Sequence, residues 1–308
     1  MSGSPRNHGA DEAFEHCILD RYAACSNTSS LANVGPVFRP GDTRPDWNCT
    51  MPRRLLLSTL AAATVLVSAA PLAAESLDTV TLRGHPQTVH LYGSRESGYP
   101  VIVSSGDGGW MHLGPHVAQF LASNGFFVVG FDARAYLESF TSRTNTLRSS
   151  EVPGDFRTLM AYAAHGTAKK PILIGVSEGA GLSVLAATDP ETKRDIAGVI
   201  GLGLPDLNEL GWRWKDASIY VTHGLPNEPQ FSAAAIASRV APVPLAAIHS
   251  THDEFVPVAD VKRVMDAASE PKRLWVIDAS NHRFSGNLPE FEHRLTDAVA
   301  WIVQHQMS

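Results

Sequence analysis

Residues 172–179 read Ile-Leu-Ile-Gly-Val-Ser-Glu-Gly, and this stretch decides the fold. Its first three residues are large and apolar and predict a buried strand, and the Ala-rich segment that follows predicts a helix. The glycines near Ser177 relieve the steric clashes of a sharp turn from strand to helix. The stretch therefore predicts a strand, a strained turn and a helix, with the Ser177 hydroxyl at the turn as a candidate nucleophile.

The rest of the chain alternates short apolar runs with longer segments of helical period. Two alternating runs, 79–82 and 88–92, predict an opening hairpin. Buried strands are predicted at 101–103, 126–131, 171–176, 196–202, 244–249 and 273–277. Helices are predicted at 116–122, 156–164, 180–187, 258–268 and 288–304. This alternation predicts a single α/β domain with a mostly parallel sheet that helices cover on both faces.

Composition restricts the partners that we expect. The 308 residues are 44% hydrophobic and carry a formal net charge of -6, which is typical of a globular protein and indicates no nucleic-acid partner. All three cysteines lie in the first 50 residues, so no Cys-based metal site or disulfide is expected further on. His112 and His116 have a zinc-binding spacing, but Leu113-Gly114-Pro115 interrupts the helix that this spacing needs. We expect no metal and no cofactor.

The N-terminal part of the chain resembles an export signal. Residues 51–54 are Met-Pro-Arg-Arg, an apolar run of 16 residues follows at 55–70, and small residues lead to Glu75. These are the three parts of a secretory signal peptide, and the run is shorter than the roughly 20 residues that span a bilayer. We therefore predict a signal peptide at 51–74 and a periplasmic or secreted protein; an uncleaved anchor is the alternative.

Residues 1–50 fit none of this organisation. They are polar and show no sustained period, and hydrophilic residues do not normally precede a signal peptide. We interpret 1–50 as a non-native upstream extension, with translation starting at Met51, or as a disordered segment. The predicted domain is 75–308.

An acid and a histidine follow the last two predicted strands. Asp253 comes after the strand at 244–249, and His282 comes after the strand at 273–277. Carboxyl ends of parallel strands meet at one edge of the sheet, so we expect both side chains near Ser177. The chain order of Ser177, Asp253 and His282 is that of the α/β-hydrolase fold, with serine as nucleophile, histidine as base and aspartate as its partner. Glu254 is the competing acid.

An oxyanion hole would need backbone N–H groups beside the nucleophile. The first donor would be Glu178, directly after Ser177, and the second would lie at Gly106 or Asp107, in the loop after the first buried strand. A phosphate-binding loop is the rival interpretation of these glycines, but the Gly-Lys-Ser/Thr that such a loop needs is missing. A plain turn is the other alternative.

Several of these segments together resemble one bacterial family. They are Ser104–Trp110, Gly130–Asp132, the stretch around Ser177, and Gly201–Gly203 with Asp206 and Trp212. They resemble the bacterial virulence protein VirJ and AcvB family over most of residues 98–304. The resemblance implies a periplasmic α/β hydrolase, similar to hydrolases of aminoacyl-phosphatidylglycerol, with a lipid head-group or small-molecule ester as substrate and possible peripheral membrane contact.

The chain departs from this family beside the nucleophile. Family members have aromatic residues on both sides of the serine, whereas this chain has Val176 and Glu178. Glu178 is a candidate to bind a substrate ammonium or to influence His282 through its charge. Trp110 and Trp212 are candidate substrate-binding residues. Trp212 belongs to a stretch, 204–226, whose aromatics indicate either a cap over the pocket or a packed insertion.

Two further functions compete with this ester hydrolase. One is a general carboxylesterase or a peptidase that uses the same three residues. The other is a periplasmic binding or chaperone-like protein without turnover. The fold alone does not choose among them, because one architecture hosts many functions.

Overall fold

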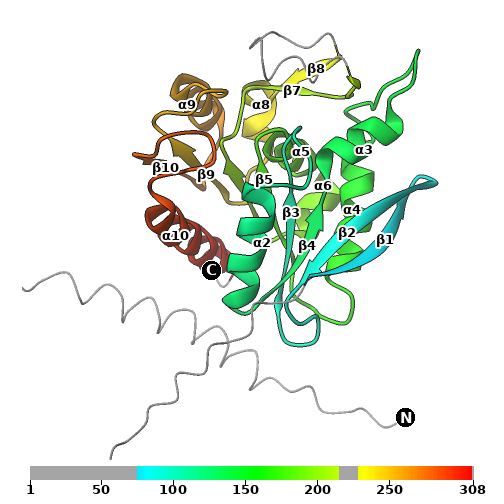
Figure 1. Ribbon diagram of the computed structural model, residues 1–308, viewed down its shortest axis with the longest axis horizontal. Helices are drawn as coiled ribbons and strands as arrows, with labels where there is room; N and C mark the ends of the chain where they lie inside the picture. The colour runs from blue at the N-terminus through cyan, green and yellow to red at the C-terminus, as the bar shows by residue number, and fades with distance from the viewer. Residues whose placement is uncertain (1–74, 215–227, 307–308) are drawn as a thin grey trace, which may run out of the picture. The chain divides into compact units, whose positions relative to one another are not determined.

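The computed structural model describes residues 75–214 and 228–306, which lie in one compact unit of the chain (Figure 1). The predictions for 1–50 and for the signal peptide at 51–74 fall outside the described residues. So does most of the predicted cap, from residue 215 to 226.

An eight-stranded sheet forms the centre of this unit, in the order β1-β2-β4-β3-β5-β6-β9-β10. The strands are β1 (Ser76–Leu82), β2 (His85–Tyr92), β3 (Tyr99–Ser104), β4 (Phe126–Phe131), β5 (Ile172–Val176), β6 (Gly198–Leu202), β9 (Leu245–Ser250) and β10 (Lys272–Ile277). The first two form the predicted antiparallel hairpin, β2 is also antiparallel to β4, and every later pair is parallel. The predicted mostly parallel sheet is confirmed.

The central strands are continuous apolar runs because both faces of the sheet are covered. Every residue of β3, β4, β5, β6 and β9 is buried, whereas β10, at the edge, is mostly half-buried or exposed. This pattern is typical of a parallel sheet between two layers of helices. It explains why the predicted bounds of β4, 126–131, agree with the structure.

Helices lie on both sides of the sheet (Figure 1). They are α2 (Leu113–Ser123), α3 (Ala133–Phe140), α4 (Val152–Ala163), α5 (Glu178–Ala186), α6 (Pro190–Asp195), α8 (Ala233–Ile236), α9 (Val258–Ala267) and α10 (Leu288–Gln306). In β6, a Cβ added at Gly198 would meet Ile302 of α10, and one added at Gly201 would meet Ala180 of α5. Residues three apart in a strand point to opposite faces, so α5 and α10 cover opposite faces.

Several features differ from the predictions, and among them are the short helices α6 and α8, which were not predicted. Helix α2 begins at Leu113, because a proline is tolerated in the first turn, where Pro115 lies. Helix α3 was not predicted; Asp132 caps it by accepting a hydrogen bond from Ala135 N at 3.0 Å. A small antiparallel sheet of β7 (Leu207–Glu209) and β8 (Gln230–Ser232) was not predicted either, because three-residue strands leave no periodic signal.

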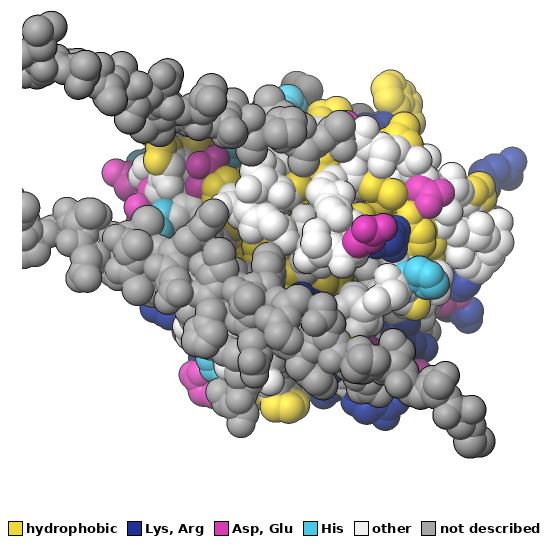
Figure 2. Space-filling view, turned by 90° about the horizontal axis from the view of Figure 1, so that it is seen from below, with side chains coloured by type: hydrophobic (Ala, Val, Ile, Leu, Met, Phe, Trp, Pro, Cys, Tyr) yellow, Lys and Arg dark blue, Asp and Glu magenta, His cyan; other side chains and the backbone are white. Residues whose placement is uncertain are grey.

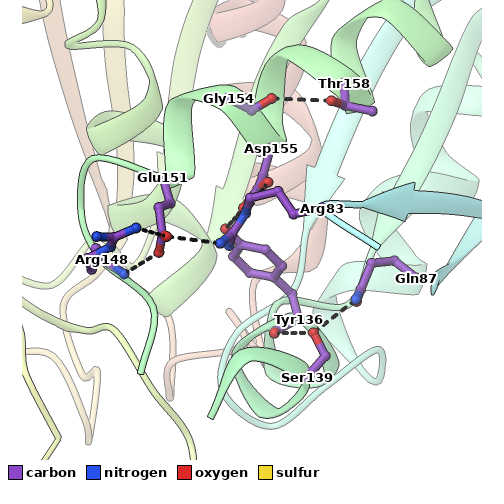
Figure 3. Close-up of polar contacts among 9 residues, drawn as sticks. All are labelled: Arg83, Gln87, Tyr136, Ser139, Arg148, Glu151, Gly154, Asp155 and Thr158. Atoms are coloured by element: carbon purple, nitrogen blue, oxygen red, sulfur yellow. Dashed lines mark hydrogen bonds and ion pairs between the residues drawn. The ribbon is translucent and has the colours of Figure 1, made fainter. Parts of the chain in front are cut away.

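An ion-pair network holds the β1–β2 hairpin to the helices (Figure 3). Arg83, in the hairpin turn, donates to Asp155 of α4 at 2.8 and 2.9 Å and pairs with Glu151 at 3.1 Å. Tyr136 of α3 donates its hydroxyl to the same Asp155 at 2.7 Å. Burial, together with the charge of Asp155, raises the pKa of Tyr136 well above its ordinary value, so this hydroxyl remains a donor.

The described surface is of mixed character. Figure 2 shows one face of the described residues, seen from below, on which hydrophobic, acidic and basic side chains are interspersed. Within 75–214 and 228–306, no helix is both long enough and apolar enough to cross a membrane.

Candidate active site

Ser177 stands on the predicted strand-to-helix turn. It follows β5 directly, has φ 50° and ψ -118°, and is the residue before α5. A positive φ is uncommon for a residue with a side chain and costs about 1–3 kcal/mol, so the surroundings must hold it in place. Its N–H donates to Leu202 O, at the end of β6, at 2.8 Å. The predicted strand, strained turn and helix are confirmed.

The motif needs a glycine at position 179 because two backbones approach closely there. A Cβ at Gly179 would lie only 2.7 Å from Ser104 O and would overlap Ser105 O. The end of β3 therefore packs directly on the first turn of α5. This contact brings the loop after β3 to the side of Ser177.

Asp253 and His282 meet as the sequence predicts. His282 Nδ1 lies 2.6 Å from Asp253 Oδ2, and the side chain of Asp253 is almost fully buried. Burial opposes ionisation of Asp253, but the hydrogen bonds from His282 and from the N–H groups of Val256 and Phe255 outweigh it and hold its pKa below the ordinary 3.8. An ionised carboxylate in this place orients the imidazole and stabilises its cation.

Glu254, the competing acid, has a different contact with the same histidine. Its Oε2 accepts a hydrogen bond from the backbone N–H of His282 at 2.7 Å. Two adjacent carboxylates thus hold His282: Asp253 contacts its ring, and Glu254 accepts from its backbone N–H. The geometry assigns the ring partner to Asp253.

The backbone between Leu202 and Gly203 links the nucleophile to the base. Leu202 O accepts from Ser177 N, and a Cβ at Gly203 would lie 2.5 Å from His282 Cε1. Gly203 also has φ 60°, so both conformation and space favour glycine there. Among the described residues, no hydrogen bond joins Ser177 Oγ to the His282 ring. Such bonds are often long in a free enzyme and tighten when substrate binds.

The loop after β3 lies against Ser177. A Cβ at Gly106 would be 3.2 Å from Ser177 Cβ and 3.9 Å from its Oγ. Gly106 O accepts from Ser105 Oγ at 3.1 Å and from Gly109 N at 3.0 Å. Because the N–H and C=O of a trans peptide point in opposite directions, the N–H of Asp107 points away from those two donors.

Three N–H groups in the segments next to the nucleophile have no acceptor in the described part of the protein. Within the described part of the chain, those of Gly106, Asp107 and Glu178 donate to no protein acceptor. The N–H of Glu178 is unpaired because it opens α5, where the first turn has no intrahelical acceptors. These are the donors that the sequence predicts for an oxyanion hole.

The side chain of Glu178 is engaged by the protein itself. It is buried, and its Oε1 accepts a hydrogen bond from Glu209 N of β7 at 2.9 Å. Burial, together with the nearby Glu209 and Asp107, raises the pKa of Glu178 well above 4.5. This carboxyl joins the start of α5 to the small sheet.

The structure gives the two predicted substrate-binding tryptophans packing roles. Trp110 stacks on His90, with ring centroids 4.8 Å apart, and a Cβ at Gly130 of β4 would overlap its indole. This packing on β2 and β4 gives Trp110 a structural role, and its contact with a substrate stays a prediction. Trp212 is buried in the hydrophobic core beneath the Arg134 guanidinium, 4.0 Å from its ring, which favours the packed-insertion alternative.

Two residues that hold the site had no assigned role in the sequence analysis. Asp132 accepts from Trp110 N at 3.0 Å and from Ala135 N at 3.0 Å, so it fixes the loop after β3 to the start of α3. Gly203 leaves room for His282. The sequence contains a signal for each: Asp132 is an acid at a strand end, and Gly203 belongs to a Gly-Leu-Gly segment. The residues that they contact are distant in sequence, so their roles could not be predicted.

An eight-stranded, mostly parallel sheet with a strained serine turn and an Asp–His pair at later strand ends defines an α/β hydrolase. Residues 99–211 match the family described as "Bacterial virulence protein (VirJ)". The resemblance predicted from the sequence is confirmed over these residues. They include β3, the loop after it, and the Ser177 turn.

Other known proteins are similar over longer stretches. A monoacylglycerol lipase from Mycolicibacterium smegmatis (strain ATCC 700084 / mc(2)155) is 28% identical, and the match covers 62% of this chain and 82% of the lipase. The crystal structure of the α/β hydrolase GrgF from Penicillium sp. sh18 has a TM-score of 0.56 at 13% identity, covering 73% of this chain and 97% of that one. A membrane phospholipase A, described as a bacterial virulence factor, has a TM-score of 0.55 at 11% identity, covering 75% and 87%. The named relatives support a hydrolase of the esterase or lipase type.

Proposed function

We propose that this protein hydrolyses esters with Ser177 as nucleophile, His282 as general base and Asp253 as its acid partner. The observation that carries the proposal is the 2.6 Å contact between His282 and the buried Asp253. This contact lies at the edge of the sheet where Ser177 stands on its strained turn. The backbone of Leu202–Gly203 contacts both Ser177 and His282. A binding protein without turnover has no need of this arrangement.

The reaction proceeds in two stages. His282 takes the proton from the Ser177 hydroxyl while Oγ attacks the ester carbonyl carbon, and the carbonyl oxygen becomes an oxyanion. The N–H of Glu178 and that of Gly106 or Asp107 stabilise this oxyanion. The C–O bond to the alcohol then breaks, and His282 gives its proton to the departing oxygen. A water molecule, activated by His282, hydrolyses the acyl-serine and restores both residues.

The substrate that we propose is a lipid ester. The named monoacylglycerol lipase supports an acyl ester of this class. The resemblance to the VirJ and AcvB family implies an aminoacyl-phosphatidylglycerol, and residues 99–211 match the VirJ family. Both are esters of a glycerol-containing lipid, so either substrate requires contact with a membrane surface.

A covalent probe tests the chemistry first. A fluorophosphonate should label the wild-type protein and should leave Ser177→Ala unlabelled. Ser183→Ala is the matched control, because Ser183 lies on the same helix and donates to Gly179 O. No labelling of the wild type would contradict the serine mechanism, and equal labelling of Ser177→Ala would place the nucleophile elsewhere.

Two substrates then separate the lipid classes. Purified protein should be assayed on vesicles that contain lysyl- or alanyl-phosphatidylglycerol and on vesicles that contain monoacylglycerol. Release of amino acid or of fatty acid identifies the ester that is cleaved. A probe-reactive protein that cleaves neither lipid but cleaves a soluble ester or a peptide would favour the general carboxylesterase or peptidase.

We also propose that the protein is exported, on the support of the signal-peptide pattern at 51–74. Fractionation of cells that express the gene, followed by N-terminal sequencing, should find a mature protein that begins near Glu75 outside the cytoplasm. A cytoplasmic protein with 51–74 intact would contradict this.

A further inference from the structure

His249, near the end of β9, contacts the turn that carries Asp253, and the mechanism above gives it no part. Its side chain is completely buried. Its Nε2 lies 3.0 Å from Val256 O and 3.9 Å from Asp253 Oδ2. The ring therefore joins β9 to the far end of the Asp253 turn.

The surroundings of this ring determine its protonation. A backbone carbonyl only accepts hydrogen bonds, so the Nε2 that faces Val256 O carries the hydrogen. Burial lowers the pKa of His249, although Asp253 and the Val256 carbonyl partly oppose this. Its Nδ1 is buried and has no partner among the described residues, so a second proton would have no acceptor there. The ring is a neutral donor.

The contact with Val256 ties the Asp253 turn to β9, in addition to the contacts that Asp253 and Glu254 make with His282. Asp253 Oδ1 accepts from Phe255 N at 3.0 Å and from Val256 N at 2.8 Å. These bonds shape the turn but do not attach it to the sheet. The His249 side chain attaches the turn to β9 at Val256 O, and the other end of the turn presents Oδ2 to His282.

We infer that His249 is a positioning residue: it pins the Asp253 turn to β9 and so keeps Asp253 Oδ2 on the ring of His282. This inference rests on the proposed function. The positioning role of His249 requires an N–H donor at the position of Nε2. It requires neither a positive charge nor an aromatic ring.

Two amide substitutions separate this role from simple packing. His249→Gln keeps an N–H donor near the position of Nε2, whereas His249→Asn places its donor near the position of Nδ1, out of reach of Val256 O. We expect His249→Asn to lower kcat about 100-fold, the usual effect of a misplacement of about 1 Å, with little change in KM. We expect His249→Gln to stay near the wild type. His305→Asn, at the exposed end of α10, is the distal control.

The pH profile gives a second measurement. In His249→Asn, a displaced Asp253 would stabilise the protonated ring of His282 less. The acidic limb of the profile of kcat/KM against pH should therefore shift to lower pH. A packing role would lower Tm in both variants and leave this limb unchanged. The inference is overturned if Asn retains full activity, or if Asn and Gln lose activity equally with no shift of the limb.

The wild-type protein provides a test that does not depend on the variants folding. In ¹⁵N-histidine NMR spectra, the Nε2 of His249 should carry a proton, because it faces Val256 O. A neutral ring that carries its proton on Nδ1 would overturn the inference. A wild type that the fluorophosphonate leaves unlabelled would overturn the proposed function as well, whereas a labelled wild type with an indifferent His249→Asn would overturn the inference alone.

Discussion

At the scale of single residues, the site depends on positions where a side chain would be too large. Gly203 gives space to the His282 ring, and Gly106 lies against the Ser177 side chain. Neither glycine has a side chain that takes part in the chemistry. Each sets where a participant can stand, and positions of this kind tolerate even a methyl group poorly.

We predict that Gly203→Ala removes most of the activity. The new Cβ would lie 2.5 Å from His282 Cε1 and 2.9 Å from Nδ1, so the ring must move away from Asp253. A displacement of about 1 Å costs about 100-fold in kcat. Gly166→Ala is the matched control: it has φ 84° and no atom within 4 Å of the added Cβ, so it carries only the backbone strain. Steady-state kinetics and Tm measure both effects, and equal kcat values for the two variants would contradict the prediction.

Glu178→Gln should change how stability depends on pH. The pKa of Glu178 is raised in the folded protein by burial and by the nearby carboxylates, so the folded state holds this proton more tightly than the unfolded state. The contribution of Glu178 to the free energy of unfolding is therefore fully present below the ordinary pKa of 4.5 and is lost as pH rises through the folded pKa. Glutamine keeps the acceptor for Glu209 N and cannot ionise. Urea unfolding between pH 5 and 9 should show a loss of stability in the wild type that the variant lacks, and parallel curves would contradict this.

At the scale of elements, the sequence predicts what is regular and buried, and it misses what tertiary contacts create. The strand at Phe126–Phe131 was predicted to the residue because both of its faces are covered. Helix α3 was missed because its residues, Ala-Arg-Ala-Tyr-Leu-Glu-Ser-Phe, gain their order from the Asp132 cap and from Tyr136. In the site, strand ends identified Ser177, Asp253 and His282, but nothing in the sequence showed that Trp110 faces β4.

We predict that Asp155→Asn weakens the attachment of the β1–β2 hairpin. Asp155 is buried and receives both Arg83 and the Tyr136 hydroxyl, so the substitution leaves Arg83 without its main counter-charge. Loss of one partner of a buried ion pair costs about 3–5 kcal/mol of stability. We expect about 3 kcal/mol here, because Arg83 can still reach water. Arg148→Ala, which removes an exposed partner of Glu151, should cost much less stability, because solvent screens this ion pair. Denaturant unfolding compares the two, and similar costs would contradict the prediction.

At the scale of the whole molecule, ionised carboxylates tie together segments that are distant in sequence. Asp189 caps α6 and binds Arg157 of α4, whereas Asp206 accepts from Ser232 and from Arg263 of α9. Asp253 joins the turn after β9 to the loop after β10. Burial opposes ionisation of all three aspartates, but their hydrogen bonds and cationic partners hold each pKa below the ordinary 3.8.

Acid should therefore unfold the protein cooperatively. A carboxylate whose pKa is lower in the folded state contributes stability that is fully present above its unfolded pKa and is lost as pH falls through the folded pKa. Because the three aspartates lie in different parts of the fold, their contributions add, and the free energy of unfolding should fall steeply below pH 4. Asp206→Asn removes one contribution, so the variant should be less stable at pH 7 and should lose less stability between pH 5 and pH 3. Urea midpoints of both proteins across this range measure the difference, and an Asp206→Asn curve parallel to the wild type would show that Asp206 has the same pKa in both states.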